Sequence, residues 1–154
     1  MATNSPGVRW LLAAGIGSML VGVLHIEIIF AGASAYRYFG AGSMVPLLER
    51  GSYLPALITS VFACVFVLWG LYAFSGAKII RPLPLLRPAL YVIGGIYTLR
   101  GVAVGLDLYF LLIGKHAAPH KTAFSAVSLI LGLCYLIGVW KIQSATDKIP
   151  IPQE

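Results

Sequence analysis

Four long apolar stretches alternate along the chain with shorter segments that contain Gly and Pro. The stretches cover about residues 10–32, 54–77, 88–113 and 123–140. A helix needs about 20 mostly apolar residues to cross the hydrocarbon core of a bilayer. The segments between them, 33–53, 78–87 and 114–122, have the Gly and Pro residues typical of loops. The pattern predicts an all-α protein, an integral membrane bundle of four transmembrane helices that forms one domain over residues 1–154.

The composition supports a membrane location. Of the 154 residues, 59% are hydrophobic and only 10% are charged, whereas soluble domains carry about 25% charged residues. A chain with this balance cannot cover a globule with a water-compatible surface. The net charge of +6 comes from 11 Lys and Arg residues that stand singly between apolar runs, so the sequence excludes nucleic acid as a partner.

The distribution of Lys and Arg between the loops predicts the orientation in the membrane, because cytoplasmic loops carry an excess of both residues. One side of the predicted bundle holds six of them and the other holds four. The six are Arg9, Lys78, Arg81, Arg87, Lys141 and Lys148. We therefore expect a multi-pass protein with both termini in the cytoplasm.

The first and third predicted spans share a short motif. Residues 26–30 and 106–110 both follow the pattern Ile or Leu, acidic residue, Ile or Leu, any residue, Phe. The two copies run in the same direction, which favours a parallel two-plus-two repeat about an axis along the membrane normal. Matches of five residues also arise by chance in apolar sequence, so this alternative stays open.

Four ionisable residues lie inside predicted spans, namely His25, Glu27, Arg100 and Asp107. Such residues are expensive in hydrocarbon and usually pair with one another or meet water. From the rise of about 1.5 Å per helical residue, all four lie between the midplane and the outer boundary of the bilayer. We therefore expect Glu27, Arg100 and Asp107 to meet in one outward-facing buried site.

Two functional hypotheses follow from this cluster. In the first, the protein binds a lipophilic or amphipathic small molecule through Arg100, His25, Tyr97 and Tyr109, with Glu27 and Asp107 as candidates for acid–base catalysis. In the second, the cluster is purely structural, and the protein is an accessory or assembly subunit of a larger membrane complex. A proton or ion path is a further alternative. The sequence leaves open the cofactor, the reaction and the oligomeric state.

His116 and His120 are the remaining histidines, and their spacing of four would place both imidazoles on one helix face. Pro119 lies between them in an expected loop, and no Cys or acidic residue is adjacent. We therefore predict no metal site at these histidines. If a metal did bind there, Glu49 or Asp107 would have to complete its ligands.

Three further segments have interpretable patterns. Small residues recur at intervals of four, at Ala14, Ser18 and Gly22, at Gly101 and Gly105, and at Ser128 and Gly132, which is typical of close helix packing within a chain or between copies. The loop at 33–53 has room for a short helix near 44–50 that would cover the site. Residues 78–88 combine three cations with three prolines, which indicates contact with anionic membrane lipid or a docking protein.

Three strings in the chain resemble small bacterial four-helix membrane proteins to which no activity is assigned. They are Ala35-Tyr-Arg-Tyr-Phe-Gly-Ala-Gly42, Leu71-Tyr-Ala-Phe-Ser-Gly-Ala77 with the Pro-rich segment after it, and Tyr97-Thr-Leu-Arg-Gly101. In size and number of spans the chain is also similar to DoxX-like proteins. The resemblance implies a four-helix bundle in a bacterial inner membrane and implies no activity.

Overall fold

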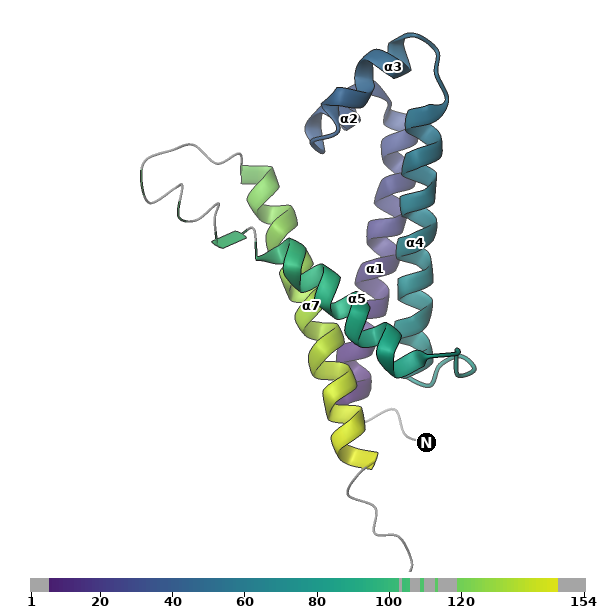
Figure 1. Cartoon of the computed structure of the whole chain (residues 1–154), viewed down its shortest axis with the longest axis vertical. Helices are drawn as coiled ribbons and strands as arrows, with labels where there is room; N and C mark the ends of the chain where they lie inside the picture. The colour runs from purple at the N-terminus through teal and green to yellow at the C-terminus, as the bar shows by residue number, and fades with distance from the viewer. Residues whose placement is uncertain (1–5, 103, 106–108, 110–112, 114–118, 147–154) are drawn as a thin grey trace, which may run out of the picture. The chain divides into compact units, whose positions relative to one another are not determined.

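The computed structural model describes residues 6–102, 104–105, 109, 113 and 119–146. These residues form helices and no strands, as predicted. The elements follow in the order α1 (Pro6–Ala31), α2 (Ala33–Tyr38), the 3-10 helix η1 (Gly42–Met44), α3 (Val45–Glu49), α4 (Leu54–Gly76), α5 (Leu86–Gly101) and α7 (Pro119–Thr146), as Figure 1 shows.

Three of the helices are long and apolar enough to cross a membrane. Their apolar parts are Gly7–Ala31, Leu54–Gly76 and Thr122–Ser144, which confirms the predicted spans at 10–32, 54–77 and 123–140. The chain is therefore a helical protein with three candidate transmembrane helices among its described residues. In the third predicted span, 88–113, helix α5 has 16 residues and ends at Gly101, and most of the following positions lie outside the described residues. The fourth span and the repeat stay predictions.

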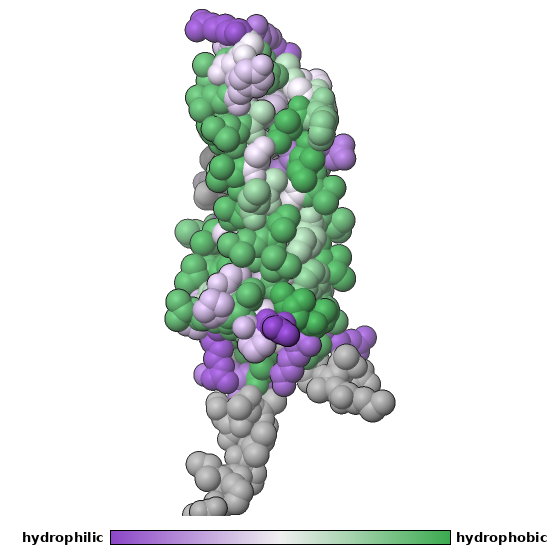
Figure 2. Space-filling model, turned by 90° about the vertical axis from the view of Figure 1, so that its right-hand side faces the viewer, coloured by the Kyte–Doolittle hydropathy of each residue, from purple (hydrophilic) through white to green (hydrophobic). Residues whose placement is uncertain are grey.

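Large apolar side chains are exposed along the long helices. Leu20 on α1, Leu57 on α4, Val92 on α5 and Ile130 on α7 are each at least 60% exposed. Figure 2 shows apolar residues over most of the face in view, with hydrophilic residues gathered near the helix ends. A soluble protein rarely exposes so continuous an apolar surface, whereas a lipid environment removes its cost.

The described residues fall into two compact units. The first contains the described parts of Met1–Ile16 and Leu71–Glu154, and the second is Gly17–Gly70. Helices α1 and α4 each contribute residues to both units, while α5 and α7 belong to the first and α2, η1 and α3 to the second.

Glycines bring α5 and α7 of the first unit into backbone contact. A Cβ atom on Gly101 would lie 2.5 Å from Cα and the backbone nitrogen of Leu129, and one on Gly132 would lie 2.9 Å from the carbonyl oxygen of Gly94. Beside this contact the rings of Tyr97 and Tyr135 stack with centroids 5.8 Å apart. The predicted packing role of Gly101 and Gly132 is thus confirmed within the chain.

In the second unit α1 packs against α4, and a short helical segment covers the end of the pair. Ser18 of α1 is fully buried, and a Cβ on Gly22 would lie 3.3 Å from the carbonyl oxygen of Ala63 on α4. We name residues 33–51, which include α2, η1 and α3, the cap segment. Its Tyr36 and Val45 form a small core with Ile28 of α1. Helix α3 confirms the short helix predicted near 44–50.

Glycines in the left-handed conformation end the two short helices of the cap segment. Gly40 (φ 87°) follows α2 and Gly51 (φ 74°) follows α3. In both, the glycine N–H and the next N–H donate to carbonyls of the last helical turn, with N···O distances between 2.8 and 3.3 Å. This is the Schellman motif, in which glycine is favoured because it has no Cβ to clash. These turns fold the cap segment back over α1 and α4.

Candidate functional site

A pocket of about 170 Å³ lies in the second unit, between α1, the cap segment and α4. Most of its lining is apolar, with an imidazole and two hydroxyl-bearing residues among the side chains. The lining residues are His25, Ile28, Tyr36, Phe39, Ala41, Met44, Ile58, Thr59 and Phe62. The pocket thus joins an apolar wall to a small number of polar groups, which is the usual composition of a small-molecule site.

His25 is the residue in this pocket with the most chemical capacity. Its Nδ1 lies 2.8 Å from the carbonyl oxygen of Val21, one turn earlier in α1. A carbonyl oxygen only accepts hydrogen bonds, so Nδ1 carries the proton and donates it. No described residue makes a hydrogen bond with Nε2. The local helix therefore sets the tautomer and leaves Nε2 of the neutral ring as an acceptor for a ligand.

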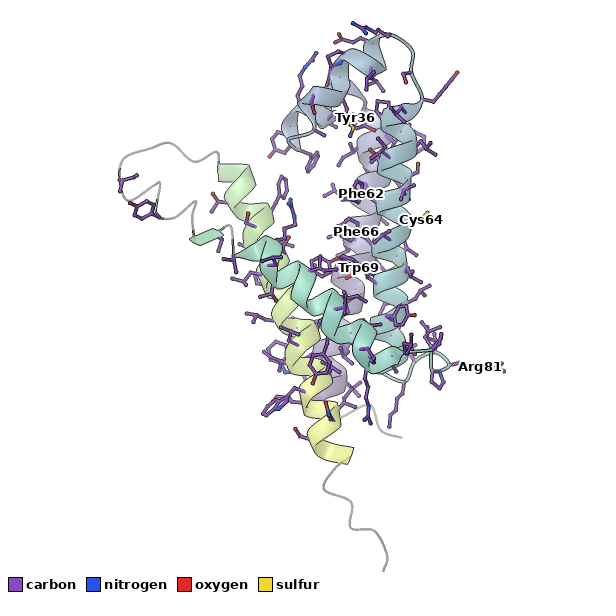
Figure 3. The ribbon with its side chains drawn as sticks, in the orientation of Figure 1. Tyr36, Phe62, Cys64, Phe66, Trp69 and Arg81 are labelled. Carbon is purple, nitrogen blue, oxygen red and sulfur yellow. The ribbon has the colours of Figure 1, made fainter. Side chains whose placement is uncertain are left out.

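Aromatic rings of α4 hold the imidazole plane. The His25 ring centroid lies 4.8 Å from that of Phe66 and 6.3 Å from that of Phe62. Phe66 in turn makes an edge contact with Trp69, with centroids 5.4 Å apart. Figure 3 shows Phe62, Phe66 and Trp69 following one another along α4, with Cys64 on another side of the helix. The spacing of four and three residues places the three rings on one helical face.

A buried chain of hydrogen bonds fastens the cap segment to α4 beside the pocket. The Thr59 hydroxyl donates to the carbonyl oxygen of Pro55 at 2.8 Å, and the Tyr36 hydroxyl lies 2.9 Å from Thr59 Oγ1. Because the single Thr59 hydroxyl proton is used on Pro55, Tyr36 must be the donor to Thr59. Tyr36 is 1% exposed and Thr59 6%, so the bond is shielded from water. It positions one wall of the pocket.

An ion pair on the surface of the cap segment adds a second link. Arg37 of α2 donates through Nη2 to Glu49 Oε1 of α3 at 2.9 Å. Both side chains are about 60% exposed, and exposed pairs of this kind contribute only about 0–1 kcal/mol. The cap segment is therefore held mainly by its apolar core and by Tyr36.

Two of the three charged residues predicted to share a site belong to different units. Glu27 belongs to α1 in the second unit, and Arg100 belongs to α5 in the first. Both are exposed, and the buried polar side chains among the described residues are all uncharged. Asp107 lies outside the described residues. The meeting of Glu27, Arg100 and Asp107 therefore stays a prediction, and no buried charged site is seen in the described part of the chain.

Arg100 has a local partner in the helix itself. It stands in the last turn of α5, where the unpaired carbonyl groups give the helix end a partial negative charge that favours a cation. We predicted Arg100 within the span at 88–113, and α5 ends one residue after it, at Gly101. Its place in a complete span stays a prediction, because most of the positions up to 113 lie outside the described residues.

The two tyrosines predicted as ligand contacts differ in environment. Tyr97 is 3% exposed and stacks on Tyr135 of α7, so its ring packs two helices together. Tyr109 is 58% exposed. Of the predicted ligand contacts, His25 lines a cavity, and its pocket partners Tyr36, Thr59 and Phe62 were not predicted. A polar Thr59 inside an apolar span was the available signal.

Metal binding finds no support in the described residues, where no group of three or more His, Cys, Asp or Glu side chains could hold an ion. His116 lies outside those residues, and the predicted absence of a metal at His116 and His120 is not tested. No protein family model, curated protein or solved structure matches the chain. Its function has to be inferred from its own residues.

Proposed function

We propose that this small helical membrane protein binds a lipophilic or amphipathic molecule in the pocket beside His25. The observation that carries the proposal is the pairing of His25 Nδ1 with the Val21 carbonyl, because it leaves Nε2 as the acceptor of a ring that lines a largely apolar cavity. An acceptor in such surroundings binds a hydroxyl donor strongly, since a ligand that leaves it unpaired forfeits a hydrogen bond.

The cavity volume limits the part of the ligand that enters. An apolar cavity of about 150 Å³ holds one benzene ring, and this pocket measures about 170 Å³. The lining of Ile28, Ile58 and Phe62 favours an apolar ring, and His25 Nε2 favours a hydroxyl group on that ring. The proposed ligand class is therefore a single-ring phenol or quinol whose apolar tail stays in the lipid.

The predicted acid–base role of Glu27 and Asp107, with Arg100 as an anchor, is not needed for this binding. Glu27 follows His25 by two residues on α1, so the two side chains point to different sides of the helix. The hypothesis of a charged outward-facing site is therefore separate from the His25 pocket and stays a prediction of its own.

A binding titration tests the proposal. Purified protein in a neutral detergent is titrated with an alkylated hydroquinone and with its dimethyl ether, and binding is followed by quenching of tryptophan fluorescence. We expect the hydroquinone to bind about tenfold more tightly than the ether, equivalent to about 1.4 kcal/mol. In His25→Phe, which keeps an aromatic ring beside Phe66, this preference should disappear.

The matched control is Tyr91→Phe. It also removes a polar group from an aromatic side chain, but Tyr91 bonds to Gln143 in the first unit at 3.0 Å, and neither residue lines the pocket. Its preference for the hydroquinone should equal that of the parent protein. Equal affinity for hydroquinone and ether in the parent protein, or an unchanged preference in His25→Phe, would rule out the site.

A second candidate function, the accessory subunit, is favoured by the exposure of Glu27. This carboxylate shares an exposed face of α1 with Val23 and Phe30, which are 51% and 82% exposed. Facing lipid, such a group is costly unless another protein covers it. Blue native electrophoresis from mild detergent tests this role: a stable complex that is lost in Glu27→Leu supports it, and a monomer in both proteins contradicts it.

A further inference from the structure

The connection between α4 and α5 begins with a lysine in a backbone conformation that favours glycine. Lys78 has φ of 62°. Its N–H donates to the Ser75 carbonyl at 3.0 Å, and the N–H of Ile79 donates to the Phe74 carbonyl at 3.0 Å. This is the same Schellman motif that Gly40 and Gly51 complete in the cap segment. The left-handed conformation is unfavourable for a residue with a Cβ, so a cation occupies this position despite the backbone preference for glycine.

Hydrogen bonds from α4 hold the rest of the connection in place. The Ser75 hydroxyl donates to the Arg81 carbonyl at 3.0 Å and accepts from the N–H of Leu83 at 2.9 Å. The Tyr72 hydroxyl donates to the Pro84 carbonyl at 3.3 Å. Ser75 is 3% exposed, so these bonds anchor the connection from inside. Residues 78–85 therefore form a fixed strap.

Beneath the strap lies a cavity of about 540 Å³ within the first unit. Its lining includes Lys78 and Arg87 as cations, the apolar side chains of Leu90, Val139 and Ile142, and the amide of Gln143. The volume is in the range of cavities that hold small molecules. The lining therefore combines positive charge with an apolar surface from α5 and α7.

The cavity lies at the level where two membrane-spanning segments end. Gly76, the last residue of the span Leu54–Gly76, lines it, and so does Gln143, next to the last residue of the span Thr122–Ser144. The ends of spans mark the boundary between hydrocarbon and lipid head groups. A ligand in this cavity would therefore have one part at head-group depth and another in hydrocarbon.

The cations at this level have no counter-charge within the described residues. Lys78, Arg81 and Arg87 are all exposed, and neither Glu27 nor Glu49 forms an ion pair with them. Figure 3 shows Arg81 extending outward from the connection. Three cations without an ion-pair partner in the described part of the chain, together with an apolar surface, match the chemistry of a phosphate group that carries acyl chains.

We propose that this cavity, the strap site, binds one anionic phospholipid, with the phosphate at Lys78 and Arg87 and an acyl chain along Leu90, Val139 and Ile142. The site lies in the first unit, whereas the His25 pocket lies in the second. A test of the strap site is therefore independent of a test of the proposed small-molecule function.

The test measures lipid binding to the full chain in a neutral detergent at low salt by native mass spectrometry. Dioleoyl phosphatidylglycerol and dioleoyl phosphatidylcholine are titrated in parallel. We expect the anionic lipid to bind at least about tenfold more tightly, because each cation near a lipid surface contributes about fivefold at low salt. The difference should shrink as salt screens the charges.

Lys78→Gly is the decisive variant because it removes the cation and suits the left-handed backbone. It should bind phosphatidylglycerol about fivefold more weakly while its thermal stability is at least that of the parent protein. Arg87→Gln should weaken binding by a similar factor. The matched control is Arg50→Gln, which removes an exposed arginine from the second unit and should leave binding unchanged.

A third arm separates a lipid from a free phosphate. Glycerol 1-phosphate, which carries the same charged group without acyl chains, should not displace phosphatidylglycerol at millimolar concentration, because the apolar contacts are missing. Displacement by glycerol 1-phosphate, equal binding of the two phospholipids, or equal losses in Lys78→Gly and Arg50→Gln would each overturn the strap site.

Discussion

Lys78 occupies at the end of α4 the left-handed position that Gly51 occupies at the end of α3. Their φ angles are 62° and 74°, and each donates its N–H to the carbonyl three residues earlier, at 3.0 and 2.9 Å. The two turns differ mainly in the side chain at this position. Comparing substitutions at the two sites therefore isolates the cost of a Cβ in this conformation.

Lys78→Gly should raise the free energy of unfolding by about 1 kcal/mol, because the left-handed strain is relieved. Gly51→Lys should lower it by a similar amount. SDS titration of the detergent-solubilised protein, followed by far-UV circular dichroism, measures both changes. If Lys78→Gly is less stable than the parent protein, the lysine side chain contributes packing that outweighs the backbone strain.

Gly101→Ala should destabilise the protein by about 1–3 kcal/mol, because the added methyl group meets the backbone of Leu129, which cannot rotate away. Gly95→Ala is the control on the same helix. Nothing lies within 4 Å of a Cβ at Gly95, so alanine there should gain up to about 1 kcal/mol of helix propensity. Thermal unfolding in detergent compares the two; similar effects would contradict the backbone contact between α5 and α7.

The Tyr36 hydroxyl should be energetically coupled to Thr59. In a double-mutant cycle with Tyr36→Phe and Thr59→Val, we expect a coupling of about 0.5–1.5 kcal/mol from the lost hydrogen bond. The control cycle combines Tyr36→Phe with Ser144→Ala, and the two effects should add. The exposed Ser144 hydroxyl bonds only within α7, to the Trp140 carbonyl at 3.0 Å. Additive effects of Tyr36→Phe and Thr59→Val would show that the cap segment is not fastened to α4 by this bond.

The two cysteines should differ in accessibility. Cys64 is exposed on α4 and Cys134 is buried on α7. A small uncharged maleimide should therefore label the folded, detergent-solubilised chain once, and Cys64→Ser should abolish that label. Mass spectrometry reports the adducts, and SDS unfolding should make Cys134 reactive as well. Labelling of Cys134 in the folded protein would contradict the burial of its side chain.

The neutral form of His25 should have its proton on Nδ1, because Val21 accepts a hydrogen bond from that nitrogen. Nitrogen-15 spectra of histidine-labelled protein in mildly alkaline buffer distinguish the two tautomers. His25→Phe identifies the signal, since the chain has 3 histidines. A proton on Nε2 would reverse the proposed geometry, with the ring donating to the ligand instead of accepting.

The long helices were predictable because their signal is local. The stretch 54–77 is apolar throughout, and α4 covers Leu54–Gly76. The short α3 was also predicted, from the length of the loop at 33–53. In the structure Pro46 lies in its first turn and Gly51 follows its end, and both residues suit these positions. Helix α2 was missed, since its six residues follow α1 with only Gly32 between them.

The candidate site was much less predictable, because its contacts join residues that are distant in sequence. Tyr36 and Thr59 are 23 residues apart, and no local sequence pattern predicts their hydrogen bond. His25 was expected to serve a charged site, yet it bonds to the backbone of its own helix. The cost of charge in hydrocarbon singles out Glu27 and Arg100 as unusual, but it does not specify which group covers each of them.

The contact between α5 and α7 has a consequence for motion in the first unit. Where Gly94, Gly101 and Gly132 bring main-chain atoms together, there is no space for an acyl chain, a water molecule or a side chain to wedge the two helices apart. The pair should therefore move together at this level during a conformational change, and diffusing species must pass around this contact instead of through it.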